Sequence, residues 1–237
     1  MTSIQALIDR QLTRRQVLEK AQVTRPIRPQ VPEPLTVITV SRETGSGGRT
    51  LARNLATRLQ FEFIDHQIVD KLVEDSGARE RLISSLDERT RSGVALWVEG
   101  ILTGRYIDRS EYAQMLIKSV TALAEHGHSV ILGRGANVIL GPRGGFHVRV
   151  TAPAEVRIQN LMRHSNMGAR EARERVSLCD EERRRFCAEV LNADVDNPND
   201  YHLTINSGRI HLDTAEELIL MAWERYLRAQ ASIRTLE

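Results

Sequence analysis

Apolar β-rich runs alternate with segments of helical periodicity along most of the chain. Residues 35–40 (LTVITV) form a largely apolar run, which is typical of a strand buried inside a parallel sheet. Directly after a glycine-rich turn, Leu51, Leu55 and Leu59 recur at i, i+4 and i+8 and predict an amphipathic helix. The chain therefore starts its main part as a strand, a turn and a helix.

The same alternation continues to the end of the sequence. Further strands are predicted at 61–65, 128–132, 147–151 and 203–205. Helices are predicted at 66–74, 154–163, 169–191 and from Asp213, where Asp213 and Glu216 form a variant of the capping box. Two or three more helices are expected within 78–125, with Gly93, Gly100 and Gly104 as interruptions. Strands that alternate with helices form parallel βαβ units, so we expect a layered α/β domain with a five-stranded parallel sheet.

Residues 1–35 differ from the rest in pattern and charge. Ile4, Ile8 and Leu12 give a predicted helix over 4–22 an apolar stripe, whereas four prolines predict a stiff linker over 24–35. We therefore divide the chain into an N-terminal helix with a proline-rich linker (1–35) and a main domain (36–237). The helix is expected to dock on the main domain or on a second subunit, which would make a homodimer.

Composition narrows the class of protein. With 237 residues, 41% hydrophobic and 27% charged, the chain can build a sizeable core. The net charge of +2 argues against nucleic acid as a partner. No apolar run approaches the ~20 residues that cross a bilayer, so no membrane partner is expected. Without a secretory signal, and with two cysteines (Cys179 and Cys187), a cytoplasmic location is expected.

The glycine-rich turn is the first candidate for chemistry. Three glycines within four residues stand between a buried strand and an amphipathic helix, where backbone N–H groups and the helix dipole attract phosphate. Arg49 would add a guanidinium, and the hydroxyl of Thr50 or Ser46 would serve a metal-bound phosphate. A tight connection that needs glycine for geometry alone is the alternative. The predicted phosphate-binding residues are Gly45, Ser46, Gly47, Gly48, Arg49 and Thr50.

The turn departs from the strict phosphate-loop pattern G-x-x-x-x-G-K-[ST]. If Gly48-Arg49-Thr50 stands for its end, Glu43 occupies the place of the first glycine. If Gly45-Ser46-Gly47 stands for the G-x-G core, Gly48 replaces the lysine and Arg42 replaces the first glycine. The lysine is missing either way, and Arg49 is the substitute that the sequence suggests, although arginine and lysine are not interchangeable at phosphate.

Four segments carry a resemblance to a known family. The run VITVSRETGSGGRTLARNLATRLQFEFIDHQIV resembles the opening of the cytidylate kinase-like family, a branch of the P-loop nucleoside monophosphate kinases. Residues 131–136 (ILGRGA), 150–157 (VTAPAEVR) and 180–206, which contain DEER and YHLTIN, agree with it in order and spacing. The resemblance implies a three-layer P-loop kinase with a helical insertion for the monophosphate (66–125) and a short lid (157–185).

The resemblance also implies roles for single residues. Arg134 would grip the acceptor phosphate, and Asp180 and Arg183 look like the D-x-x-R of the family, which meets the acceptor and the transferring phosphates. Asp65 resembles an acid beside the acceptor. The implied catalytic set is Arg49, Arg134, Arg157 and Arg183, the acceptor set is Asp65, Arg134, Asp180 and Arg183, and the metal ligand is Thr50. An aspartate that helps read cytosine is replaced by Gly135, which leaves the base specificity open.

Three functions remain as hypotheses. The first is ATP- and Mg²⁺-dependent phosphoryl transfer to a CMP- or dCMP-like acceptor. The second, suggested by the missing lysine, is a nucleotide-binding regulatory module with weak or no turnover. The third is an interaction protein whose basic N-terminal helix recruits nucleic acid or an acidic partner, although the net charge of +3 over residues 1–35 is small for a nucleic-acid arm.

Overall fold

A single parallel sheet forms the centre of the protein. The computed structural model describes residues 4–22, 36–86, 88–104 and 110–234. The five strands lie in the order β2-β3-β1-β4-β5, and every neighbouring pair is parallel. Their bounds are Val37–Arg42 (β1), Glu62–Ile64 (β2), Ser129–Leu132 (β3), Phe146–Thr151 (β4) and Leu203–Asn206 (β5). The predicted α/β class with five parallel strands is confirmed.

The helices follow the strands as the periodicity predicts. The N-terminal half contains α1 (Ile4–Gln22), α2 (Gly48–Leu59), α3 (His66–Glu74), α4 (Ser76–Ser84), α5 (Glu88–Gly104) and α6 (Glu111–His126). The C-terminal half contains α7 (Ala136–Leu140), α8 (Ala154–Ser165), α9 (Ala169–Leu191) and α10 (Leu212–Arg234), with a 3-10 turn at Pro198–Asp200. The short helix α7 is the one that the hydrophobic pattern does not predict.

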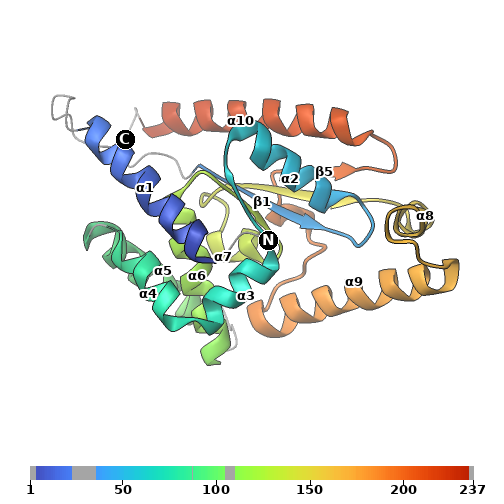
Figure 1. Cartoon of the computed structure of the whole chain (residues 1–237), viewed down its shortest axis with the longest axis horizontal. Coiled ribbons are helices and arrows are strands. Elements are labelled where there is room, and N and C mark those ends of the chain that lie inside the picture. Colours follow the sequence, from blue (N-terminus) through green and yellow to red (C-terminus); the bar gives the residue numbers. More distant parts are fainter. Residues whose placement is uncertain (1–3, 23–35, 87, 105–109, 235–237) are drawn as a thin grey trace.

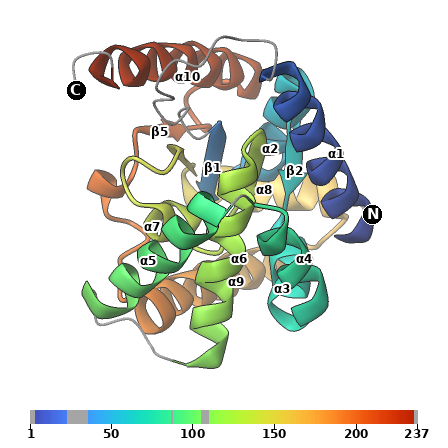
Figure 2. The ribbon, with the colours of Figure 1, turned by 90° about the vertical axis from the view of Figure 1, so that its left-hand side faces the viewer.

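Alternating strand residues divide the core into two layers. Val37 and Ile131 pack with α1 and α3–α7, whereas Ile38 and Val130 on the other face pack with α2 and α10. Figures 1 and 2 show α2 and α10 over one face of the sheet and the helical segment α3–α6 against the other. The three layers leave the carboxyl ends of the strands free to carry a site.

Helix α1 packs against the main domain. Leu7 and Ile8 are fully buried in the same hydrophobic cluster as α3, α4 and α6. Arg10 adds a two-pronged ion pair to Glu62 at the start of β2, with distances of 2.6 and 2.9 Å. The predicted linker at 24–35 falls outside the described residues. Within the described ranges, no helix has both the length and the apolar character needed to span a membrane.

Two local predictions are wrong. Gly93 and Gly100 lie inside α5 instead of interrupting it. A helical glycine costs about 1 kcal/mol, and burial of Val94 and Val98 on the same helix offsets that cost. The capping box is not formed, because α10 starts at Leu212 and the Glu216 carboxylate accepts a 3.0 Å hydrogen bond from Arg58 instead.

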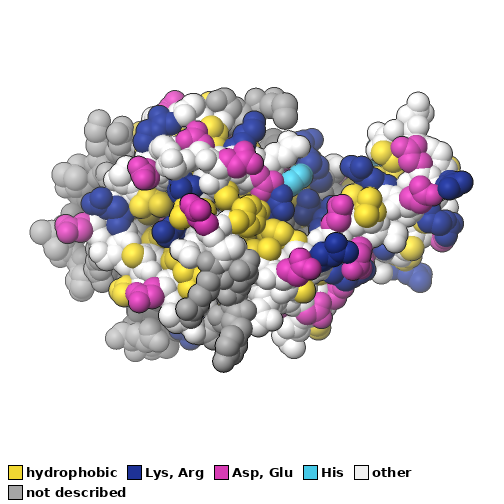
Figure 3. Space-filling view, turned by 90° about the horizontal axis from the view of Figure 1, so that it is seen from below, with side chains coloured by type: hydrophobic (Ala, Val, Ile, Leu, Met, Phe, Trp, Pro, Cys, Tyr) yellow, Lys and Arg dark blue, Asp and Glu magenta, His cyan; other side chains and the backbone are white. Residues whose placement is uncertain are grey.

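Helices α8 and α9 form a smaller lobe with its own hydrophobic cluster of Ile158, Ala172 and Val176. Figure 3 shows this lobe as a projection on the right, joined to the body at a narrower waist. Acidic and basic side chains alternate over its surface in that view, as expected for a solvated face. The lobe corresponds to the lid that the sequence predicts.

Candidate phosphate-binding and acceptor site

The glycine-rich turn connects β1 to α2 and leaves the amino end of α2 open. Gly45 and Gly47 have φ angles of 80° and 78°, which favour glycine. A side chain at Gly45 would collide with the carbonyl of Arg157, and one at Gly47 would meet Leu212 Cδ1 at 2.9 Å. No side chain caps the helix at Gly47. The first N–H groups of α2 therefore have no partner within the helix and suit an anion.

A cavity of about 860 Å³ opens in front of this turn. Its walls come from the ends of β1 and β3, the start of α3, and the lid helices. Thr50 is exposed on its rim, whereas the Ser46 hydroxyl is buried and donates to the Glu43 carbonyl at 2.8 Å. Of the two hydroxyls predicted for a metal-bound phosphate, that of Thr50 is the accessible one.

Arg49 leaves the turn toward the end of β2. Its Nη2 donates to Asp65 Oδ2 at 2.5 Å, and the Arg49 side chain is 47% exposed. The second oxygen of Asp65 caps α3 by accepting from the N–H groups of Gln67 and Ile68. Asp65 therefore fixes both the start of α3 and the direction of Arg49.

Arg134 occupies the turn after β3 with a φ of 55°. Its guanidinium pairs with Asp70 on α3 and lies 5.0 Å from the ring centre of Phe186 on α9. Three buried polar atoms in this region have no hydrogen-bond partner among the described residues, namely His66 Nδ1, Asp70 Oδ1 and Arg134 Nε. Buried groups of this kind are costly, so this part of the cavity suits a polar ligand.

The adjoining Gly135 explains the absent aspartate. Its φ of 62° lies in the left-handed region, and a Cβ there would collide with Leu191 Cδ1. A side chain at this position would therefore be strained and would have to displace the tip of Leu191, which favours glycine.

The lid is tied to the glycine-rich turn by Asp180. This buried carboxylate accepts from the Thr44 N–H at 2.8 Å and from Arg183 at 2.9 Å, and it also pairs with Arg157. Arg157 Nε donates to the Ala152 carbonyl at 2.9 Å, and its Nη1 donates to the Thr44 carbonyl at 3.3 Å. Arg183 also donates to the Thr44 hydroxyl and remains on the cavity wall. Arg157 and Asp180 are thus engaged by protein groups, while Arg183 faces the cavity.

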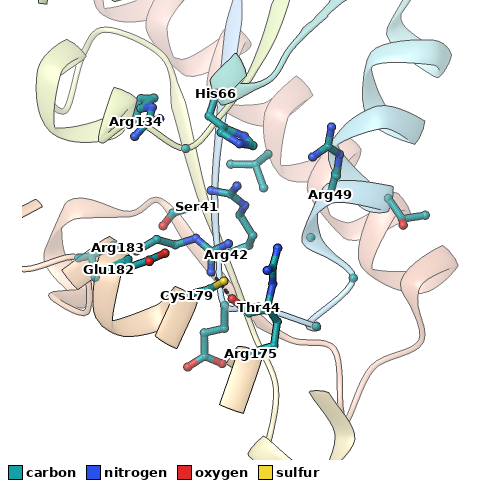
Figure 4. A pocket seen from close by; sticks show the side chains of 18 of the residues that line it. Ser41, Arg42, Thr44, Arg49, His66, Arg134, Arg175, Cys179, Glu182 and Arg183 are labelled. Carbon is teal, nitrogen blue, oxygen red and sulfur yellow. Dashed lines mark hydrogen bonds between the residues drawn. The ribbon is translucent and has the colours of Figure 1, made fainter. Parts of the chain in front are cut away.

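Sequence reasoning assigned no role to the residue at the centre of the cavity. Arg42, the last residue of β1, stands between Arg183 and Arg175 on the lid side and His66 and Arg134 on the other (Figure 4). Burial and the like charges of Arg183, Arg49 and Arg134 lower the pKa of Arg42 to about 9. The sequence feature that could have indicated Arg42 is its place in the phosphate-loop pattern, where it stands at the position of the first glycine.

Histidine 66 lies beside Arg42 and opens α3. Burial, with the charges of Arg42 and Arg134, lowers its pKa. The imidazole is therefore neutral at neutral pH, which spares the cavity a further positive charge.

The strand order, the glycine-rich turn after β1 and the arginine-lined cavity define a P-loop kinase-like protein. The chain belongs to the cytidylate kinase-like family, whose model matches residues 37–209. Membership of this family supports a nucleotide-binding, kinase-like function. No curated protein matches the sequence.

Three solved structures are similar to this chain over most of its length. An uncharacterized protein from Eubacterium ventriosum ATCC 27560 is 19% identical, with a TM-score of 0.61, over 82% of this chain and 99% of that one. The shikimate kinase from Acinetobacter baumannii, solved with shikimate, is 17% identical, with a TM-score of 0.41, over 79% and 92% of the two chains. That of Bacteroides thetaiotaomicron is 17% identical, with a TM-score of 0.40, over 83% and 98%.

Proposed function

We propose that this protein transfers the γ-phosphoryl group of ATP to a small phosphate-bearing acceptor of the CMP or dCMP kind. The observation that carries the proposal is the gathering of four guanidinium groups, those of Arg42, Arg49, Arg134 and Arg183, around a helix N-terminus in one cavity. Phosphoryl transfer requires two anionic groups held in line and the charge on the transferring group neutralised. A cavity lined in this way suits both requirements.

The residues divide into a donor side and an acceptor side. The N–H groups of Gly45–Thr50 hold the phosphates of ATP, and Arg49 lies at the same end of α2. Arg134 binds the acceptor phosphate, with Asp65 and His66 beside it at the start of α3. Arg183 reaches from the lid to the transferring group, and Arg157 with Asp180 holds the turn and the lid together.

Magnesium enters this scheme as part of the MgATP substrate. The described residues contain no group of three or more histidine, cysteine or acidic side chains able to hold a metal. Mg²⁺ commonly keeps several waters and is held mainly by substrate phosphates, which fits a site where the exposed Thr50 hydroxyl supplies one ligand. The ion neutralises phosphate charge, and the chain's own residues orient the two substrates.

The test is ADP formation from MgATP with a panel of monophosphates, CMP, dCMP, UMP, AMP and GMP among them. We expect turnover with a pyrimidine monophosphate, and Arg134→Gln should raise KM for that monophosphate far more than KM for ATP. Arg170→Ala is the matched control, because the Arg170 side chain is 93% exposed on the lid.

Two results would redirect the proposal. Folded protein that binds MgATP without forming ADP with any acceptor supports the regulatory-module alternative, which the glycine at the lysine position favours. Folded protein that binds no nucleotide at all refutes both functions.

A further inference from the structure

Two unusual residues of the glycine-rich turn touch each other in the fold. In the register that places Gly45-Ser46-Gly47 on the G-x-G core, Arg42 stands for the first glycine and Gly48 for the lysine. A Cβ built on Gly48 would lie 2.6 Å from Arg42 Cβ and 3.3 Å from Arg42 Cγ. The stem of Arg42 therefore fills the space through which a side chain at position 48 would leave the backbone.

A second glycine makes room for the other end of Arg42. A Cβ on Gly133, in the turn after β3, would collide with Arg42 Nη1. Gly133 is the neighbour of Arg134, which we assign to the acceptor. The side chain of Arg42 thus runs from the donor turn at Gly48 to the acceptor turn at Gly133, and its guanidinium lies where the two substrates meet.

The lack of a carboxylate partner distinguishes Arg42 from the three arginines whose charges lower its pKa. Arg175, exposed on the lid wall of the same cavity, has no ion pair among the described residues either. Arg49, Arg134 and Arg183 each pair with a carboxylate, those of Asp65, Asp70 and Asp180 respectively. In the part of the chain that the structure describes, the Arg42 guanidinium has no hydrogen bond and no ion pair. Its positive charge is therefore available to an anion, and its pKa is lowered by burial and by the charges of Arg183, Arg49 and Arg134.

We propose that Arg42 supplies the phosphate-binding cation that the strict loop takes from lysine, moved from the start of α2 to the end of β1. This proposal rests on the phosphoryl-transfer function above. In that reaction an acceptor phosphate oxygen forms a bond to the γ-phosphorus, the bond from phosphorus to the bridging oxygen breaks, and ADP leaves with the electron pair. The Arg42 fork contacts the oxygens of the transferring group, and Arg49 remains with Asp65.

The experiment compares Arg42→Met, Arg42→Gly, Gly48→Lys and the double swap Arg42→Gly/Gly48→Lys with the wild type. Circular dichroism checks the fold, calorimetry measures binding of MgATP and MgADP, and the assay uses the best acceptor of the panel. Arg42→Met should lower kcat by roughly 10²–10³-fold and should weaken MgATP more than MgADP, because the contact is to the transferring group. Arg170→Ala should match the wild type.

The double variant tests whether a lysine at position 48 can replace the arginine at position 42. Gly48→Lys alone should lose nucleotide binding, because a side chain at 48 meets the stem of Arg42. The double swap should exceed the kcat/KM of each single variant by ~10-fold or more, a non-additivity expected of residues in contact. If the wild type is active and Arg42→Met retains its kcat and its MgATP-over-MgADP preference within ~3-fold, this assignment is overturned. If the folded wild type binds no nucleotide, the proposed function falls together with it.

Discussion

Removing the charge of Arg42 should stabilise the protein in the absence of an anion. The substitution Arg42→Met keeps a hydrocarbon stem of similar length against Gly48 and removes the guanidinium from its three positive neighbours. A pKa near 9 means that folding lowers the proton affinity of Arg42 by roughly three and a half powers of ten. Each power of ten is about 1.4 kcal/mol, so the penalty has an upper bound of about 5 kcal/mol.

Relaxation of side chains and water in the cavity will reduce that figure, and we expect a gain of about 2–4 kcal/mol. For a domain of this size that corresponds to a rise in Tm of about 5–10 °C. The assay is urea and thermal unfolding, followed by circular dichroism in an anion-poor buffer near neutral pH. Arg170→Met, on the exposed outer face of the lid, is the control and should change stability by less than about 0.5 kcal/mol.

The unfolding free energies of the wild type and of Arg42→Met should also depend differently on pH. The pKa of Arg42 is lower in the folded protein than in the unfolded chain, so the unfolded chain holds more protons above pH 9. The free-energy penalty of the Arg42 charge is full below pH 9 and declines as the pH rises above 9. The difference in unfolding free energy between Arg42→Met and the wild type should therefore become smaller above pH 9. MgATP at a fixed high concentration should also narrow the difference in unfolding free energy, because it binds the wild type more tightly than the variant. An Arg42→Met variant less stable than the wild type without ligand would refute the electrostatic argument.

Three further outcomes follow from buried groups and glycines. Asp180→Asn should cost about 1.5–3 kcal/mol in urea unfolding, because buried Arg157 loses its closer carboxylate and keeps only Glu43, at 3.5 Å. Gly135→Ala should lower the unfolding free energy by about 2–3 kcal/mol, because φ is positive there and the new Cβ would collide with Leu191. Gly93→Ala should raise it by about 0.5–1 kcal/mol, because the new Cβ would meet open space inside a helix. Equal effects of the two variants would contradict this account. Burial lowers the pKa of His147 to about 4, so the wild type should lose about 3 kcal/mol of its unfolding free energy as the pH falls from 6.5 toward 4. The variant His147→Gln should flatten that part of the curve of unfolding free energy against pH. An unchanged slope would argue against a buried, neutral His147.

The order of elements followed from the sequence because hydrophobic period and burial agree along most of the chain. Val37 and Ile38 of β1 pack into the clusters on opposite faces of the sheet, as do Ile131 and Val130 of β3, which is the arrangement that an apolar, β-branched run predicts. Helix α5 was harder to predict from the sequence, because Gly93 and Gly100 disfavour a helix locally. Burial of Val94 and Val98 stabilises the helix in the folded protein. Helix propensity alone therefore gives the wrong prediction for this segment, because tertiary packing outweighs it.

The structure brings several of the residues named from the sequence to one cavity, but the arginine at the centre of that cavity was not among them. The i, i+3 spacing of Asp180 and Arg183 places both on one face of α9, and both reach Thr44. The spacing gives no indication that Arg157 and the turn already occupy the Asp180 carboxylate. Arg42 was missed because a search along the loop motif looks for its cation after the glycines, whereas the contact between positions 42 and 48 exists only in three dimensions.

The three Arg–Asp pairs explain how so many guanidinium groups gather before a ligand arrives. Two of the aspartates belong to α3, Asp65 as its N-cap and Asp70 within it, whereas Asp180 lies on α9. Paired in this way, Arg49, Arg134 and Arg183 are oriented at little electrostatic cost, and a polyanion would have to share them with their carboxylates. The unpaired Arg42 carries the uncompensated charge at the centre, and binding energy is largest where a ligand satisfies a group that the protein leaves unsatisfied. We therefore expect the proposed transferring phosphoryl group to be held most strongly by Arg42, the unpaired arginine at the centre, and less by the paired arginines or by Arg175 on the exposed lid wall.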